Sequence, residues 1–78
     1  MLKVTIASPK GILLETETEV VIAKTVNGEV SFYPNHLPYL STIDNGYIKV
    51  NNQTYEIDNG SILLDENNNV TILINSEK

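Results

Sequence analysis

Apolar and polar residues alternate with a period of two along almost the whole of this sequence. In the first such segment, Val4 and Ile6 alternate with Lys3 and Thr5, and no stretch shows the 3.6-residue period of an amphipathic helix. Clusters of Asn, Asp, Gly and Pro interrupt the alternation about every ten positions, a spacing typical of antiparallel sheets. The pattern predicts an all-β protein, a two-sheet antiparallel β-sandwich of about ten short strands.

Turn-forming residues set the expected strand ends. Asn27-Gly28 tolerates the positive φ of a tight hairpin. Pro34 and Pro38 keep the segment between them out of a central ladder, because proline has no N–H to donate, and we expect a rigid connection there. The other clusters predicted as turns are residues 8–11, 44–46, 51–52, 58–60 and 67–69.

A few apolar residues depart from the alternation. The residues expected to point inward are Val4, Ile6, Ile12, Leu14, Val20, Ile22, Val30, Phe32, Ile48, Val50, Tyr55, Ile57, Ile62, Leu64, Val70, Ile72 and Ile74. The residues that fall on the opposite face of their own strands are Leu13, Val21, Leu63 and Leu73. Two interpretations of this second set remain open. Either the four residues lie at a sheet edge covered by loops, or they form an exposed apolar patch, which a small monomer rarely keeps without a partner.

Length and charge restrict the function classes. The 78 residues allow one domain, 1–78, near the lower size limit for an independent core. Five Lys against ten Asp and Glu give a net charge of −5, which argues against nucleic acid and against an anionic lipid surface as partners. The sequence contains no cysteine, no export signal and no apolar run of about 18 residues, so we expect a soluble chain without direct membrane insertion. A protein partner or a small ligand remains.

The residues that could carry chemistry are few. His36 is the only histidine, so it can neither form a zinc-binding pair nor be assigned to a catalytic triad; it either ties its Pro-bounded turn together or lies at a contact. Glu15, Glu17 and Glu19 share one strand face, which indicates a solvated surface rather than a metal site. The four glycines lie far apart and form no phosphate-binding loop. We therefore predict no catalytic, cofactor-binding or metal-ligating residues, no cofactor and no enzymatic activity.

One segment points to a family. Residues 27–40 read Asn-Gly-Glu-Val-Ser-Phe-Tyr-Pro-Asn-His-Leu-Pro-Tyr-Leu. This segment resembles the signature of the epsilon subunit of the rotary F-type ATP synthase, matched at Gly28, Glu29, Pro34, His36, Pro38 and Leu40. Residues 8–11 and 69–73 are similar to the first turn and the last strand of that family's N-terminal β-sandwich domain. Ser31, Leu37 and Ser61 depart from it, standing where the family usually has Gly, Ala and Gly.

The resemblance implies a non-catalytic subunit of the central stalk. Such a subunit couples the gamma shaft to the proton-driven c-ring, as part of a hetero-oligomer bound peripherally at the cytoplasmic face of the cell membrane. Gly28 and Glu29 would lie on the c-ring side, and His36, Leu37 and Pro38 on the gamma side. Typical members continue with a C-terminal helical hairpin, which we expect to be absent from this chain because it stops at Lys78.

Two alternatives stay open beside this one. The chain could be the rotor subunit of a related ATPase that lacks a proton channel. It could also be a lipoyl- or biotinyl-type carrier domain, which is another small acidic β-sandwich. A carrier needs a lysine at a hairpin tip, whereas the tips expected at 44–46, 51–52 and 67–69 carry none and Lys49 lies within a strand pattern.

Overall fold

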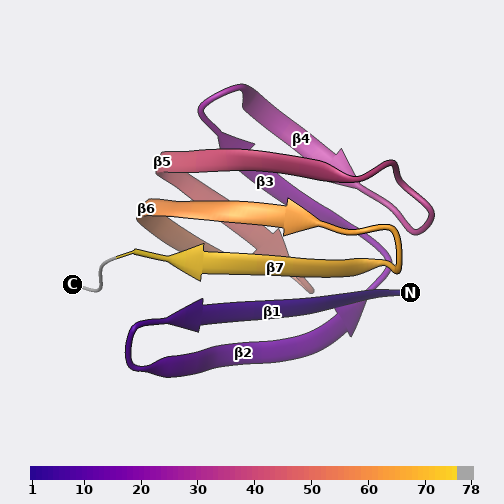
Figure 1. Cartoon of the computed structure of the whole chain (residues 1–78), viewed down its shortest axis with the longest axis horizontal. Helices are drawn as coiled ribbons and strands as arrows, with labels where there is room; N and C mark the ends of the chain where they lie inside the picture. The colour runs from indigo at the N-terminus through magenta and orange to yellow at the C-terminus, as the bar shows by residue number, and fades with distance from the viewer. Residues whose placement is uncertain (76–78) are drawn as a thin grey trace.

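Seven β-strands and no helix make up the part of the chain that the structure describes. The computed structural model describes residues 1–75, and the predicted domain end at Lys78 lies outside them. The strands are β1 (Leu2–Ser8), β2 (Gly11–Thr18), β3 (Val21–Thr25), β4 (Gly28–Phe32), β5 (Tyr39–Val50), β6 (Gln53–Leu64) and β7 (Asn69–Ile74). They form one hydrogen-bonded sheet in the order β2-β1-β7-β6-β5-β3-β4, which folds over into two layers (Figure 1). The predicted all-β sandwich is confirmed.

One long hairpin joins the two layers, because β5 and β6 are each 12 residues long and run through both. The front sheet of Figure 1 consists of β2, β1 and β7 with residues 59–64 of β6 and 39–44 of β5. The back sheet consists of residues 53–57 of β6 and 46–50 of β5 with β3 and β4. Pairing is antiparallel except between β1 and β7, which are parallel.

The strand count differs from the expectation for a local reason. Residues 44–46 and 58–60 were predicted as turns between short strands, but they are bends within β5 and β6. The backbone stays paired across both bends, with Asp44 opposite Asn59 and Gly46 opposite Ile57. Seven strands therefore replace the roughly ten expected from turn signals alone.

Close packing at the bends requires glycine. A Cβ atom at Gly46 would lie 2.1 Å from the carbonyl oxygen of Lys24, and one at Gly60 would lie 2.3 Å from the carbonyl oxygen of Leu73. Asn45 precedes the first of these glycines with a φ of 51°, a left-handed conformation that Asn tolerates better than most residues. The two Asn-Gly pairs thus let neighbouring strands approach where the hairpin changes layer.

The core lies between the two sheets and follows the alternation. The buried apolar residues are Leu2, Val4, Ile6, Val21, Ala23, Phe32, Ile43, Ile48, Val50, Ile57, Ile62, Leu64, Val70 and Ile72. Each large side chain in this set contributes about 1.5–3 kcal/mol by leaving water. A chain of this size depends on such a core, because it has no cysteine with which to form a disulfide.

The orientation of β3 was predicted wrongly. Val20 and Ile22 were expected to point inward, but they are partly exposed, whereas Val21, expected in the outward patch, is fully buried. The reason is the register of the β3–β4 hairpin, which places Val21 opposite Phe32. Paired residues point to the same face of a sheet, so the inward Phe32 brings Val21 inward with it.

The orientation at the start of β2 was also predicted wrongly. Ile12 was expected to be buried with Leu14, but it is 61% exposed. A β-bulge explains this, since Leu14 lies opposite Ile6 and Ile12 lies opposite Ala7, which leaves Leu13 as the extra residue. The extra residue shifts the alternation of faces by one position across the bulge, so Ile12, just before it, points to the outer face with Ala7, and both Ile12 and Leu13 are exposed.

Candidate docking surfaces

The outer face of the front sheet carries a group of exposed apolar side chains. We call this group the apolar face; it consists of Ala7, Ile12, Leu13, Leu40, Leu63 and Leu73. Leu40 lies directly opposite Leu63, and Leu73 lies opposite both Ser61 and Ala7. Leu40, Leu63 and Leu73 are 71%, 45% and 49% exposed. Leu63 and Leu73 are diagonal neighbours on adjacent strands, about 7–8 Å apart, so the leucines form a continuous surface.

The predicted outward residues are therefore placed in two different environments. Leu13, Leu63 and Leu73 belong to the apolar face, with Leu13 at the edge formed by β2. Val21 belongs to the core and takes no part. Leu40 and Ile12 were missed as members of this face. The strand pairing of Leu40 with Leu63 would have indicated the first, but nothing in the sequence marks the bulge that exposes the second.

The outer face of the back sheet is polar. We call it the polar face; it consists of Ile22, Lys24, Glu29, Ser31, Tyr47, Lys49, Thr54 and Glu56. Lys24 lies between Glu29 on β4 and Tyr47 on β5. The Tyr47 hydroxyl donates a hydrogen bond to the Glu29 carboxylate, and Lys49 Nζ lies 5.3 Å from the centre of the Tyr47 ring. The hydrogen bond to Glu29 raises the pKa of the Tyr47 hydroxyl, with smaller contributions in the same direction from desolvation and from the negative charge of Glu29.

Gly28 and Glu29 lie at the tip of the β3–β4 hairpin, and both are exposed. Thr25 ties this tip together: its hydroxyl accepts from the Asn27 N–H at 3.0 Å and donates to the Gly28 carbonyl at 3.1 Å. The Asn27 amide donates to Ser41 Oγ on β5 at 3.1 Å. Gly28 has a φ of 101°, which favours glycine. The hairpin tip is therefore rigid although it is exposed.

His36 to Pro38 lie in the connection between β4 and β5. The His36 ring packs edge-on against Phe32 at a centroid distance of 5.3 Å. Its Nδ1 lies 2.7 Å from the Leu37 carbonyl, so Nδ1 carries the proton and donates. Leu37 is 79% exposed and Pro38 is exposed. His36 thus braces the loop from inside while its two neighbours face outward.

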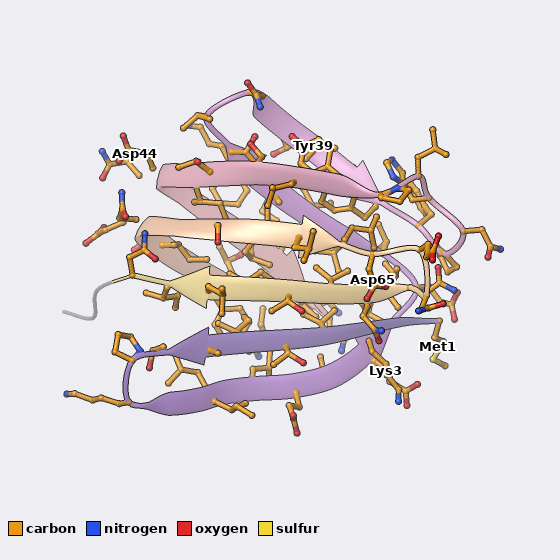
Figure 2. The ribbon with its side chains drawn as sticks, viewed as in Figure 1. Met1, Lys3, Tyr39, Asp44 and Asp65 are labelled. Atoms are coloured by element: carbon orange, nitrogen blue, oxygen red, sulfur yellow. The ribbon has the colours of Figure 1, made fainter. Side chains whose placement is uncertain are left out.

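The two predicted contact segments are not brought together. Gly28 begins β4 and the His36 loop follows its end, so they lie at opposite ends of that strand (Figure 1). In Figure 2, Asp44 lies at one end of the molecule and Met1, Lys3 and Asp65 lie at the other. The two segments are therefore separate surfaces of the molecule.

A polar link at the His36 end was not predicted. Asn68, in the turn between β6 and β7, accepts from the Lys3 N–H through its carbonyl at 2.9 Å and from the Asn35 N–H through its side chain at 2.8 Å. In the same turn the Asp65 carboxylate accepts three hydrogen bonds from Asn67 and Asn69. The backbone N–H of Asn69 is the largest cause that lowers the pKa of Asp65. The sequence indicates a turn here but not the three segments that it joins.

The groups with shifted pKa values do not converge. Tyr39 and Tyr47 lie on the two halves of β5, in different sheets, and Asp65 lies in the turn after β6. In each case hydrogen bonds to neighbouring side chains or backbone are the leading cause of the shift. Among residues 1–75 no group of three or more His, Asp or Glu is placed to hold a metal ion. No helix in those residues has the length and apolar character to cross a membrane. The geometry is that of a small β-sandwich with one apolar face and two distinct ends.

Comparison with known proteins gives the family. Residues 1–77 match the family model described as ATP synthase, Delta/Epsilon chain, beta-sandwich domain. The chain belongs to this family, which confirms the resemblance seen in residues 27–40.

The relatives are similar over most of this chain. The ATP synthase epsilon chain of Desulfitobacterium hafniense is 38% identical over 71 residues, covering 87% of this chain and 54% of that protein. The chloroplastic epsilon chain of Marchantia polymorpha is 34% identical over 79 residues, covering 96% and 58%. The chain thus spans somewhat more than half the length of these relatives.

The fold is also similar to a solved structure. One chain of the cryo-EM structure of the Tetrahymena thermophila mitochondrial ATP synthase, central stalk and c-ring, has a TM-score of 0.76 to this chain. The identity is 16%, and the match covers 96% of this chain and 63% of that one. At this identity the likeness shows the fold alone.

Proposed function

We propose that this chain is a non-catalytic rotor subunit of an F-type ATP synthase that holds the gamma shaft and the c-ring together. Family membership supports the first part, and two separated contact regions on one rigid body support the second. The observation that carries the proposal is the apolar face. Three leucines between 45% and 71% exposed on adjacent strands need a covering partner in a small domain.

The apolar face and the His36 loop form the gamma side in this proposal. Leu40 connects them, because it lies on the apolar face only two residues after Pro38. An apolar surface surrounded by polar residues is typical of a lasting protein interface. Leu37, at 79% exposure, extends the same contact at the end of the molecule.

The β3–β4 hairpin forms the ring side. Gly28 and Glu29 lie at the end opposite to His36, and the bonds from Thr25 and Asn27 hold their backbone in place. A rigid exposed tip with one carboxylate suits contact with polar loops. The proposed attachment to the membrane is peripheral and indirect, through the ring, in a hetero-oligomeric complex at the cytoplasmic face.

The mechanism is torque transfer by a stiff connector. A close-packed sandwich resists deformation, since its interior has the packing density of an organic crystal. Turning of the ring is then transmitted through the hairpin end to the shaft on the apolar face. The chemistry of nucleotide exchange takes place in other subunits, and this chain contributes contacts.

Binding to a purified cognate gamma subunit tests the proposal. Leu63→Lys places a charge in the middle of the apolar face, and we expect it to weaken binding at least about thirtyfold, the effect of losing a hot-spot residue. Thr54→Lys is the matched control, because Thr54 is exposed on the polar face. Both variants should unfold at the wild-type urea concentration. Absence of gamma binding by the wild-type chain, or equal loss in both variants, would contradict the proposal.

The ring side has its own test. In the reconstituted complex, Glu29→Lys should uncouple proton pumping from ATP hydrolysis while gamma binding stays close to the wild-type level. The two readouts are the pumping-to-hydrolysis ratio and the affinity for gamma. Equal loss of both would show that the hairpin tip is misplaced in this scheme.

A further inference from the structure

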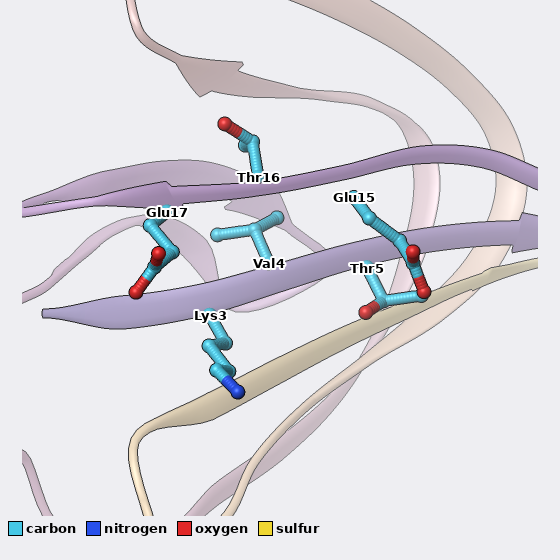
Figure 3. A pocket seen from close by; sticks show the side chains of 6 residues that line it. All are labelled: Lys3, Val4, Thr5, Glu15, Thr16 and Glu17. Carbon is cyan, nitrogen blue, oxygen red and sulfur yellow. The ribbon is translucent and has the colours of Figure 1, made fainter.

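The outer face of the front sheet has a second feature beside its leucines. A shallow hollow of about 480 Å³ lies across the β1–β2 pair, lined by Lys3, Val4, Thr5, Glu15, Thr16 and Glu17. Figure 3 shows that Glu15 and Glu17 reach to the same side of the strand pair as Lys3 and Thr5, while Val4 and Thr16 point to the other side. The carboxylates therefore belong to the outer surface of the front sheet.

The hollow is continuous with the apolar face. Glu15 lies opposite Thr5, Thr5 lies beside Thr71, and Thr71 lies opposite Leu63. Three strand spacings separate Glu15 from Leu63, about 15 Å in all, which is well within the width of one protein interface. Any partner large enough to cover the leucines will reach the hollow.

The negative charge of the hollow is not neutralised within the described chain. Glu15 and Glu17 make no ion pair or side-chain hydrogen bond in residues 1–75. Lys3 lies opposite Glu17 and offsets only one of the two carboxylates. The Asn51 amide donates to the Glu17 main-chain carbonyl at 3.3 Å and holds the backbone of β2 at this point. Two exposed carboxylates thus project from the paired strand β2 at the border of the apolar face.

This charge pattern decides between possible occupants. A second copy of the chain would bring the same net charge of −5 and the same carboxylates. No charged side chain occurs in β7, in residues 59–64 of β6 or in residues 39–43 of β5. The outer surface of the front sheet therefore has uncharged strands on one side and acidic residues on the other. The complementary surface is an apolar strip bordered by cationic side chains.

We propose that the partner covering the apolar face carries Lys or Arg side chains that settle in the β1–β2 hollow, where Glu15 and Glu17 steer its approach. This inference rests on the proposed function, in which the partner is the gamma shaft, and adds the chemistry of the partner's rim. Exposed charges at a rim act mainly on the association rate, and salt screens them.

Association kinetics with purified cognate gamma test this inference. The variants are Glu15→Gln/Glu17→Gln, the single Glu17→Gln, and Glu56→Gln as matched control for one exposed carboxylate on the polar face. At low ionic strength the double variant should associate about tenfold more slowly than the wild type, with an unchanged dissociation rate. Glu17→Gln should show part of the effect and Glu56→Gln none. The differences should disappear in high salt.

The outcomes separate the two proposals. If the double variant keeps the wild-type association rate and salt dependence while Leu63→Lys loses binding, the steering role is overturned and the docking role stands. Faster association of the double variant would mean an acidic rim on the partner and would also overturn the inference. If the wild type sediments as a homodimer and Leu63→Lys sediments as a monomer, the apolar face binds a second copy of the chain instead. Lack of gamma binding by the wild type removes the proposed function itself.

Discussion

The two outer faces of the sandwich have the same backbone architecture but carry different side chains. Both are the solvent sides of twisted sheets over the same core, and both receive residues from β5 and β6. On the front sheet these strands present Leu40 and Leu63; on the back sheet they present Tyr47, Lys49 and Glu56. The polar face has charges of both signs placed side by side, as expected for a surface in water.

This difference shows what the core does not require. The buried core residues suffice to hold both sheets together, since the back sheet packs on the same core although its solvent-exposed outer face carries no leucine. The apolar face therefore has a cause outside the fold, which under the proposed function is a covering partner. Substitution of core residues should therefore damage folding, whereas substitution of residues on the apolar face should damage docking.

The largest effect is expected where the hairpin passes from one face to the other. Gly46→Ala would place a Cβ 2.1 Å from a backbone carbonyl oxygen, and Gly60→Ala would place one 2.3 Å from another. The strands must separate to admit it, so we expect each variant to lose about 3 kcal/mol or more of its unfolding free energy. Urea unfolding followed by circular dichroism measures this.

Ser61→Ala is the control for the bend, because Ser61 follows Gly60 but faces outward and is only partly buried. It should stay within about 0.5 kcal/mol of the wild type. If both glycine variants kept wild-type stability, the bends would be flexible and would not hold the two outer faces at a fixed separation.

A smaller effect distinguishes inside from outside on one strand. Ile62 is fully buried and its neighbour Leu63 is 45% exposed on the apolar face. Ile62→Val should cost about 1 kcal/mol, a fall in melting temperature of about 4–8 °C for a domain of this size. Leu63→Val should stay within about 0.5 kcal/mol. Thermal melts of the two variants check the pair, and equal losses would show that Leu63 is a folding residue and not a docking residue.

The sequence predicted the layers of this fold better than the orientation of individual strands. Alternation and turn spacing were enough for an all-β sandwich, because both report directly on backbone geometry. Orientation failed in β3, where Val21 takes its direction from Phe32 across the hairpin, and at Ile12, where a bulge changes it. Both errors come from pairing between strands, which single-strand periodicity does not contain.

The candidate site was predictable to a similar degree. Leu63 and Leu73 stood out as residues that break the alternation, and the motif in residues 27–40 gave the family. The acidic hollow was not predicted, because Glu15 and Glu17 look like any solvated strand face until β1 and β7 place them beside the leucines. A docking surface assembled from distant strands becomes visible only with the sheet order.

A weaker, pH-dependent effect on stability is expected from Asp65, at the end of the molecule beside Lys3. Hydrogen bonds from Asn69 and Asn67 lower the pKa of Asp65 below its ordinary value of 3.8. The carboxylate therefore stabilises the fold above that value, and the contribution is lost as the pH falls through the lower folded pKa. Asp65→Asn keeps an acceptor but does not titrate, so its urea midpoint should fall less than that of the wild type between about pH 5 and pH 2.

Glu66→Gln controls for this change, because it removes an adjacent exposed carboxylate that accepts no hydrogen bond in residues 1–75. Its acid profile should follow that of the wild type. An Asp65→Asn profile identical to the wild type would mean that the turn opens before the carboxylate is protonated. The link through Asn68 between Lys3 and Asn35 would then be weaker than its geometry indicates.

The smallest effect is expected on the polar face, from Tyr47→Phe. The hydrogen bond to Glu29 raises the pKa of the Tyr47 hydroxyl above its ordinary value of 10.0. The protonated hydroxyl therefore stabilises the folded state below pH 10, and this contribution is lost as the pH rises through the raised folded pKa. The Phe variant lacks this loss, so its urea midpoint should approach that of the wild type between about pH 9 and pH 11.

Tyr33→Phe is the matched control, because Tyr33 is 58% exposed and its hydroxyl makes no hydrogen bond in residues 1–75. Tyr47→Phe should also bind gamma as the wild type does, since the polar face needs no cover. A loss of gamma binding in this variant, with Tyr33→Phe unaffected, would show that the partner extends around the molecule onto the back sheet. The contrast between the two faces would then reflect two halves of one interface and not one docked face and one face in water.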